Sequence, residues 1–189
     1  MTINRHAMVD YVDLVIANTT DARHIRLLEV LRAHMIAEAA EDVDALLATI
    51  SHHRVQYRTW GSAPELDPGT REEVAEFYRQ RKAQGMLYFQ FDIDRLTISD
   101  DIIITDGVMT SLLTGATLAT QGYPGFSDTS VHEVTARLCI SWPFDDSGLL
   151  TGEETYTAPT NFRTLEPEEV PADFAANIAH TQNAPSPVQ

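Results

Sequence analysis

The sequence predicts an α+β fold in which N-terminal helices pack in the concavity of a strongly curved, mostly antiparallel sheet, a cone-shaped and half-open barrel. Helical patterns come first, and strand patterns then follow one another from residue 86 to residue 157. No helical segments remain to form the crossovers of a parallel sheet. The apolar alternation at residues 131–144 is longer than an ordinary strand, so this strand must bend. A bent sheet around helices leaves a hollow, and we therefore expect a pocket there.

Three helices are expected before the sheet. Residues 21–40 carry apolar side chains at spacings of three and four, with charged residues between them, which is typical of an amphipathic helix. A short helix at residues 43–50 follows two acidic residues, whose charge favours a helix N-terminus. The third helix begins at a capping box that opens with Thr70, and Gly85 ends it.

The rest of the domain is expected to be strands and turns. Asp106-Gly107 is a favoured hairpin turn, so the segments on either side of it should form two strands. Residues 121–127, which contain two glycines, are expected to form a loop that covers the cavity. The other expected strands are residues 54–60, 87–99, 131–144 and 149–157.

The length suits one domain, and 43% apolar residues are enough to form its core. We expect an N-terminal extension at residues 1–20 and the cone domain at 21–158. Residues 159–189 contain prolines among acidic residues and are expected to form a partly ordered tail.

Composition excludes several classes of function. The chain has 13 Lys and Arg residues against 28 Asp and Glu, a formal charge of −15, which would repel nucleic acid and anionic membranes. Neither a membrane span nor an N-terminal leader is visible, so we expect a cytoplasmic protein. Cys139 is the single cysteine, and His52-His53 are adjacent and cannot share a helix face. With phosphate-binding and zinc motifs also absent from the sequence, we expect no metal and no other cofactor.

Three stretches carry a family resemblance: residues 41–47, 71–78 and 142–156, the last of which is the most specific. They resemble the SnoaL-like family of polyketide cyclases, part of the nuclear-transport-factor-like superfamily with limonene epoxide hydrolase, scytalone dehydratase and ketosteroid isomerase. The resemblance covers about residues 22–158. It implies a cofactor-independent acid/base cyclase, dehydratase or isomerase that acts on a hydrophobic, oxygenated, polyketide- or steroid-like substrate. It also implies a homodimer formed through the outer face of the sheet.

The closing strand departs from that family at one position. Many relatives carry a working aspartate two residues after the conserved tyrosine, and here Tyr156 is followed by Ala158 at that position. A second interpretation therefore stays open, a non-catalytic protein that binds a small ligand, or serves as an accessory protein, through the same pocket.

His132 and Glu154 are the candidate catalytic residues. His132 shares the parity of the apolar side chains in residues 131–144, which places it on the concave face, where a histidine can exchange protons near neutral pH. The alternative is a hydrogen-bonded histidine at the end of a strand. Glu154 and Tyr156 share the parity of Ala158 and are expected to point into the cavity, although a glutamate here is also consistent with an exposed position.

Aromatic residues and one histidine are the candidate substrate contacts. Tyr57 alternates in phase with Val55 and should reach the hollow, where its hydroxyl would orient a carbonyl or hydroxyl group. Packing in the core explains these aromatic residues equally well. The predicted substrate-binding set is Tyr57, Tyr156, Trp60, Tyr78, His53 and Trp142.

Overall fold

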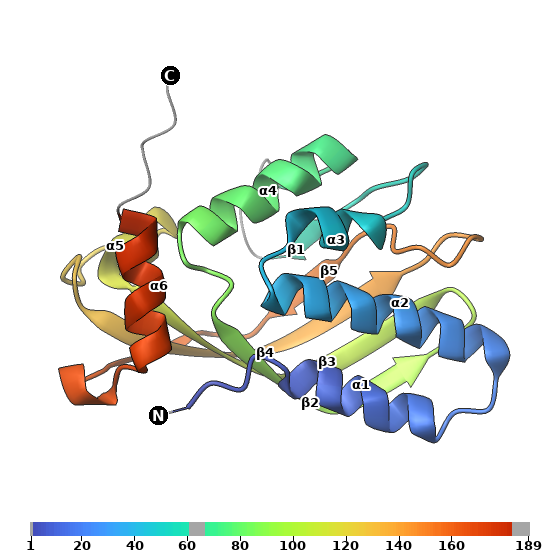
Figure 1. The fold of residues 1–189 in the computed structure, drawn as a ribbon, viewed down its shortest axis with the longest axis horizontal. Helices are drawn as coiled ribbons and strands as arrows, with labels where there is room; N and C mark the ends of the chain where they lie inside the picture. Colours follow the sequence, from blue (N-terminus) through green and yellow to red (C-terminus); the bar gives the residue numbers. More distant parts are fainter. Residues whose placement is uncertain (1, 61–66, 183–189) are drawn as a thin grey trace.

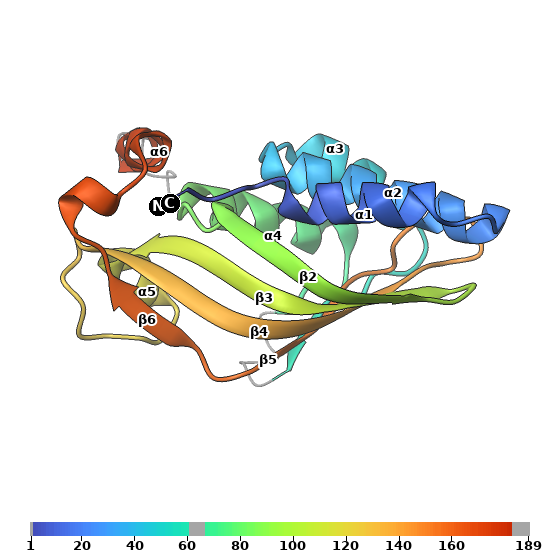
Figure 2. The same ribbon diagram turned by 90° about the horizontal axis from the view of Figure 1, so that it is seen from below.

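The computed structural model describes residues 2–60 and 67–182. A layer of helices covers the concave face of one curved sheet, as Figures 1 and 2 show from two sides, and this confirms the predicted α+β cone. The helices of this layer are α1 (Ala7–Ala17), α2 (Ala22–Ala39), α3 (Val43–Ala48) and α4 (Arg71–Ala83). At one end of the sheet lie α5 (Gly115–Thr120), a 3-10 turn (Pro167–Glu169) and α6 (Ala172–Gln182).

The sheet is mixed, with one parallel pair at its edge. Its strands follow the order β1-β5-β4-β3-β2, and β1 is parallel to β5 while the other pairs are antiparallel. The last strand, β6, pairs with the first half of β4, beyond the end of β5. The bounds are β1 (Arg58–Trp60), β2 (Phe89–Ile98), β3 (Ile102–Thr114), β4 (Val131–Pro143), β5 (Glu154–Thr157) and β6 (Asn161–Thr164).

The helix starts follow the sequence signals. Asp21 caps α2 by accepting hydrogen bonds from two backbone amides of the first turn. The predicted capping box of α4 is present, because the Thr70 hydroxyl accepts from the Glu73 amide and the Glu73 carboxylate accepts from the Thr70 amide. These contacts satisfy amides that a helix cannot pair internally, and they fix the residues at which α2 and α4 begin.

The hairpin predicted at Asp106-Gly107 is wrong, since both residues lie inside the continuous strand β3. The chain turns instead at residues 99–101, between β2 and β3. Gly107 is needed for a close approach of strands: a Cβ atom there would lie 2.1 Å from the Asp92 carbonyl oxygen. The register of β2 shifts between Ile93 and Arg95 at this point, which indicates a bulge that bends the sheet.

Both ends of the chain contribute to packed structure. Helix α1 lies within the expected N-terminal extension and adds Met8, Val9 and Val12 to the main core. In the expected tail, Phe174 of α6 is buried against Tyr88 in a second, smaller core. Residues 183–189 of that tail lie outside the described residues.

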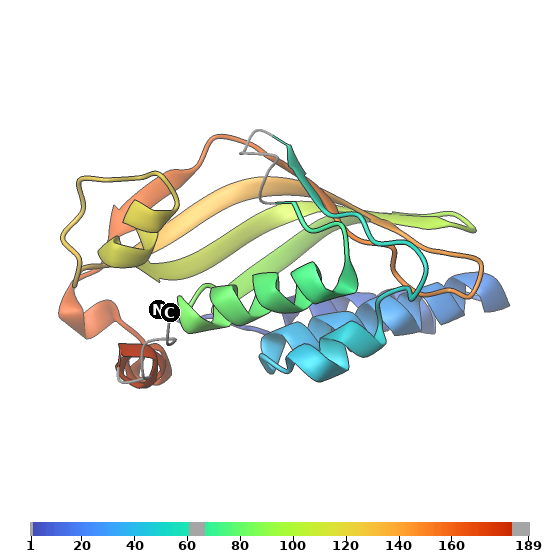
Figure 3. The ribbon, with the colours of Figure 1, turned by 90° about the horizontal axis from the view of Figure 1, so that it is seen from above.

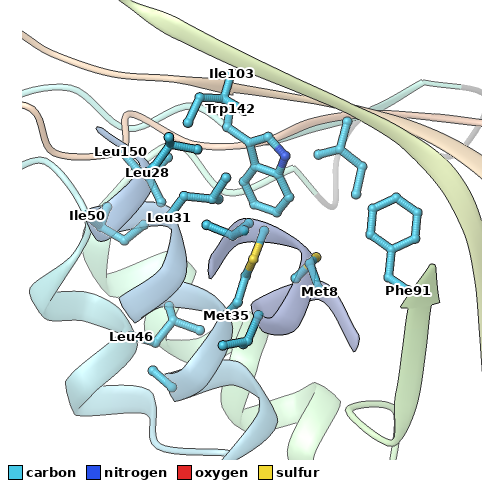
Figure 4. Packing of buried hydrophobic residues seen from close by; sticks show 14 of the residues in the cluster. Met8, Leu28, Leu31, Met35, Leu46, Ile50, Phe91, Ile103, Trp142 and Leu150 are labelled. Carbon is cyan, nitrogen blue, oxygen red and sulfur yellow. The ribbon is translucent and has the colours of Figure 1, made fainter. Parts of the chain in front are cut away.

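The main core lies between the helix layer and the sheet (Figure 4). Trp142 of β4 is at its centre, 1% exposed, and its indole N–H donates to Thr105 Oγ1 at 2.9 Å. Leu28, Leu31 and Met35 of α2 surround it from the helix side. Among the described residues, no helix combines the length and apolar character that crossing a membrane requires.

Candidate functional site

A cavity of about 270 Å³ opens between the helix layer and the concave face of the sheet. Figure 3 shows α4 running along this face of the sheet. The sheet side of the cavity is mostly apolar, because residues of alternate parity on β2, β3 and β4 point into it. The apolar ones are Phe89, Phe91, Met109, Leu113, Val134, Ala136, Leu138, Ile140 and Trp142, and the hydroxyl residues Ser111, Thr155 and Thr157 also line it.

A second wall of the cavity, built from both layers, carries a cluster of polar groups. Glu38 comes from α2, Tyr78 and Arg81 from α4, and Tyr57 and Glu153 from the segments before β1 and β5. The Tyr78 hydroxyl donates to Glu153 Oε1 at 2.6 Å. The Tyr57 hydroxyl is buried beside Tyr78 and Glu153, but no hydrogen bond of good geometry joins it to the residues that the structure describes. This wall therefore presents two carboxyl groups and two tyrosine hydroxyls to one largely apolar cavity.

His34 of α2 lies behind Glu153 and is 0% exposed. Its Nε2 is 3.5 Å from Glu153 Oε1 and 3.5 Å from the Tyr78 hydroxyl oxygen. On the other side of the ring, Nδ1 is 2.8 Å from Thr49 Oγ1. A histidine with polar partners on both nitrogens has a fixed ring orientation, so Glu153 is held from behind as well as from the cavity.

The two carboxyl groups of the cavity have opposite pKa shifts. Burial, together with the charge of Glu153, raises the pKa of Glu38 to about 7. Burial also acts to raise the pKa of Glu153, but the hydrogen bond and charge of His34, with the Tyr78 hydrogen bond, outweigh it and lower that pKa. Glu153 is therefore ionised at neutral pH, while Glu38 exchanges a proton there. Such a pair can divide the roles of base and acid between two residues.

The tyrosines of this wall stay protonated. Burial raises the pKa of both Tyr57 and Tyr78 well above the ordinary value, and the charge of Glu153 adds to the effect. Both hydroxyls therefore act as hydrogen-bond donors. Among the described residues, no group of three or more His, Cys, Asp or Glu side chains is placed to hold a metal ion.

No protein-family model and no curated protein sequence matches this chain. Solved structures do match. Protein RV0760c from Mycobacterium tuberculosis superposes with a TM-score of 0.53 at 16% identity, over 77% of this chain and 99% of that one. A second structure of RV0760c, in complex with estradiol-17beta-hemisuccinate, gives 0.53 at 16% identity, over 72% and 98%.

Two further structures agree. An LEH-like epoxide hydrolase from M. tuberculosis has a TM-score of 0.50 at 17% identity, over 70% of this chain and 83% of that one. An NTF2-like protein from Anabaena variabilis has 0.53 at 11% identity, over 75% and 94%. The chain has the NTF2-like fold. This confirms the predicted fold, with helices on the concave face of a curved sheet.

Three of the sequence-predicted contacts line the cavity of this NTF2-like fold: Tyr57, Tyr78 and Trp142. The other two aromatic candidates lie elsewhere. Trp60 and Tyr156 are 43% and 47% exposed, and their rings stack on each other at 5.7 Å outside the cavity lining. His53 is exposed as well, with its backbone amide bound to the Ser51 hydroxyl.

The closing strand of this NTF2-like sheet has the opposite parity to the one expected. Thr155 pairs with Ile140 of β4, whose side chain lines the cavity. Residues directly opposite on neighbouring strands share a face, so Thr155 and Glu153 face the cavity. Glu154 and Tyr156 face the other side of the sheet. The carboxylate in the cavity is thus Glu153, one residue before the predicted one.

His132 is buried at 1% exposed but lies beyond the cavity lining, at the start of β4. Its Nε2 is 2.6 Å from Ser130 Oγ and its Nδ1 is 3.2 Å from Thr164 Oγ1. The Phe126 ring covers it, with 4.4 Å between ring centroids. Burial lowers the pKa of His132. The strand parity is as expected, but the cavity ends before this position.

Sequence reasoning did not find His34, Glu38, Glu153 or Arg81. A signal for two of them exists, because His34 and Glu38 continue the helical spacing of Leu27 and Leu31 on α2. Ionisable residues at core-facing positions of a helix are rare unless they are paired. These two ionisable side chains on the buried face therefore indicate that α2 forms a wall of the site.

The pH dependence of stability should reveal Glu38. Its pKa is raised on folding, so its contribution is full below the unfolded-state pKa and is lost as pH rises toward about 7. Between pH 5 and pH 8 the wild type should lose on the order of 2 kcal/mol of unfolding free energy relative to Glu38→Gln. Urea denaturation of both proteins at the two pH values measures this. Parallel profiles would contradict the assignment of a raised pKa.

Proposed function

We propose that this chain is a cofactor-independent enzyme of small-molecule metabolism that works by general acid/base catalysis. Its substrate would be a hydrophobic, oxygenated molecule, and its reaction a cyclisation, dehydration or isomerisation. One observation carries the proposal: two carboxyl groups, Glu38 and Glu153, line the same largely apolar cavity, and their contacts favour different protonation states. Pairs of this kind are a mark of acid/base catalysis.

The geometry suggests a role for each group. Glu153 is the base, and it takes a proton from a carbon next to a substrate carbonyl. As the C–H bond breaks, its electron pair forms a C=C bond to the carbonyl carbon, and the C=O π pair moves to the oxygen, which accepts a hydrogen bond from Tyr57. A donor already in position stabilises such a developing charge. Glu38, when protonated, returns a proton to another carbon or to a leaving hydroxyl group.

The cavity bounds the size of the substrate. A volume of about 270 Å³ is near the lower end of small-molecule sites, which span roughly 300–1,000 Å³. We therefore expect a compact molecule of about two fused rings, with its apolar face on the sheet and its oxygen toward Tyr57. RV0760c, which has a similar fold, has been solved in complex with estradiol-17beta-hemisuccinate, so a protein of this fold binds an apolar oxygenated ligand.

Hydrogen–deuterium exchange tests the proposal. The protein is incubated in D₂O with two-ring ketones, such as α-tetralone, and deuterium at the carbon next to the carbonyl is followed by proton NMR. We expect the wild type to accelerate exchange above the buffer rate. Heat-denatured protein is the control for catalysis by buffer or free side chains.

The second candidate function is a non-catalytic protein that binds a small ligand. The apolar sheet wall and the exposed Ala158 at the family's aspartate position favour it. The same experiment separates the two. A ketone that shifts protein resonances on binding but is recovered without deuterium would support the binding protein over the enzyme.

A second copy of this chain is the partner that we propose for the convex face of the sheet. Val108 and Tyr156 are exposed there, beside an ion-pair cluster in which Arg137 contacts Asp94 and Asp106 at 2.8 Å each. Exposed apolar side chains next to paired charges suit a self-complementary interface. The molar mass in solution, measured by light scattering, tests the dimer.

A further inference from the structure

The proton of the Thr49 hydroxyl has a fixed place. Thr49 Oγ1 is 2.6 Å from the Leu46 carbonyl oxygen. A carbonyl oxygen carries no proton, and two oxygens this close repel each other unless a proton lies between them. The threonine must therefore donate to Leu46. The same carbonyl, near the C-terminal end of α3, also accepts from the Thr49 backbone amide at 3.0 Å, and its two lone pairs suit two donors.

This donation determines what His34 must do. Thr49 Oγ1 is 2.8 Å from His34 Nδ1, and its only proton is already used toward Leu46. The hydroxyl can then only accept from the ring, so Nδ1 carries a hydrogen. A neutral imidazole has one N–H, and with that hydrogen on Nδ1 the other nitrogen would be a bare acceptor.

The surroundings of Nε2 do not suit a bare acceptor. Nε2 faces Glu153 Oε1 and the Tyr78 hydroxyl oxygen, both at 3.5 Å. The Tyr78 proton is used on Glu153, so both neighbours are acceptors. An unprotonated Nε2 would leave acceptors facing each other in a buried site, which is costly. A proton on Nε2 makes the ring a donor on both sides, and the Glu153 charge compensates it.

We propose that Thr49 is a positioning residue: it holds a proton on Nδ1 of His34, so that His34 is an imidazolium that keeps Glu153 ionised. The kinetic consequence rests on the proposed function, but the protonation state of His34 does not. The other groups that act on Glu153 are Tyr78, Tyr57, Arg81 and Glu38. Two cationic residues, Arg81 and Arg58, line the cavity, and the Arg58 guanidinium lies over the Trp60 ring. His34 contacts Glu153 from behind the cavity.

The ion pair explains why the two carboxyl groups differ. His34 offsets the charge of Glu153 from behind, and Glu38 then meets a neighbour that is already negative. Without the imidazolium, Glu153 and Glu38 would compete for the same proton in one cavity. Thr49 would thus set the division between base and acid from outside the cavity lining.

Nitrogen-15 NMR of histidine-labelled protein at pH 7 tests the proposal directly. His34 resonances are assigned by their loss in His34→Asn, and Thr49→Val and Thr49→Ser form the matched pair. In the wild type and Thr49→Ser, both ring nitrogens of His34 should be protonated. In Thr49→Val, Nδ1 loses its acceptor, and the ring should become neutral with its hydrogen on Nε2. An unprotonated Nδ1 in the wild type would overturn the proposal, whether or not any variant folds.

The pH profile of ketone exchange is the second readout. Turnover needs ionised Glu153, so the exchange rate rises with pH through the pKa of that group. Loss of the imidazolium in Thr49→Val should move the midpoint of this rise to higher pH by about one unit, the effect of one hydrogen bond to a charged group. At pH values below the midpoint, exchange by this variant would be about tenfold slower than by the wild type, while Thr49→Ser should keep the wild-type profile. An unchanged midpoint in folded Thr49→Val would refute the positioning role. If no ketone exchanges, only the proposed function fails, because the NMR result stands alone.

Discussion

Glu153→Gln is expected to lower the rate of ketone exchange at saturating substrate by about 10²- to 10⁴-fold, the usual contribution of a positioned general base. The glutamine keeps an oxygen that can accept from Tyr78, whose hydroxyl is 2.6 Å from Glu153 Oε1 in the wild type. It also has nearly the same volume, so the fold should survive. The amide cannot take a proton from carbon at neutral pH, and the proposed chemistry therefore stops.

The neighbouring residue supplies a matched control. Glu154→Gln makes the same chemical change one position along the chain, where the side chain faces away from the cavity in the pairing of β5 with β4. It should leave the exchange rate within about twofold of wild type, because a substitution at the surface rarely perturbs a distant site. Equal losses in the two variants would remove Glu153 from the mechanism. Circular dichroism of both variants confirms that the fold is retained.

The contrast between Glu153 and Glu154 shows where the sequence stops being informative. The pattern of β4 predicts its inward face correctly, because every second residue from Val134 to Trp142 is apolar. Strand β5 has four residues and begins after Gly152, which has a φ of 146° and lies against Gln56. In so short a strand after such a bend, the residue pattern alone does not show which side chains point inward. The hydrogen bonds to β4 determine which side chains of β5 face the cavity, and no local pattern predicts that pairing.

The helical half of the fold is more predictable than the site it helps to build. Caps at Asp21 and Thr70 locate α2 and α4 from local chemistry alone. The site, however, brings together Glu38, Tyr78 and Glu153 from three separate segments. That convergence depends on how α2 and α4 cross the sheet. The sequence can mark His34 and Glu38 as unusual on a buried helix face, but it cannot show that they meet Glu153.

Stability depends most on the tryptophan at the centre of the core. Trp142→Ala should reduce the free energy of unfolding by about 3–5 kcal/mol, the usual cost of removing a buried aromatic side chain. Trp142 is 1% exposed and its indole N–H donates to Thr105 Oγ1 at 2.9 Å. The variant leaves a hollow and a buried hydroxyl without its donor, so two penalties add. Urea denaturation followed by far-ultraviolet circular dichroism measures the loss.

The second tryptophan of the chain is the control for this prediction. Trp60 is 43% exposed and stacks on Tyr156 at 5.7 Å. An aromatic pair of this kind contributes roughly 0.5–1.5 kcal/mol beyond burial, and less where water reaches both rings, so Trp60→Ala should cost at most about 1 kcal/mol. Equal losses at the two positions would mean that Trp142 does not hold the helix layer against the sheet. A loss confined to Trp142→Ala would show that the apolar wall of the cavity is also the core of the fold. In that case, changes that enlarge the cavity at this wall would reduce stability, and substrate specificity would be altered more safely on the polar wall.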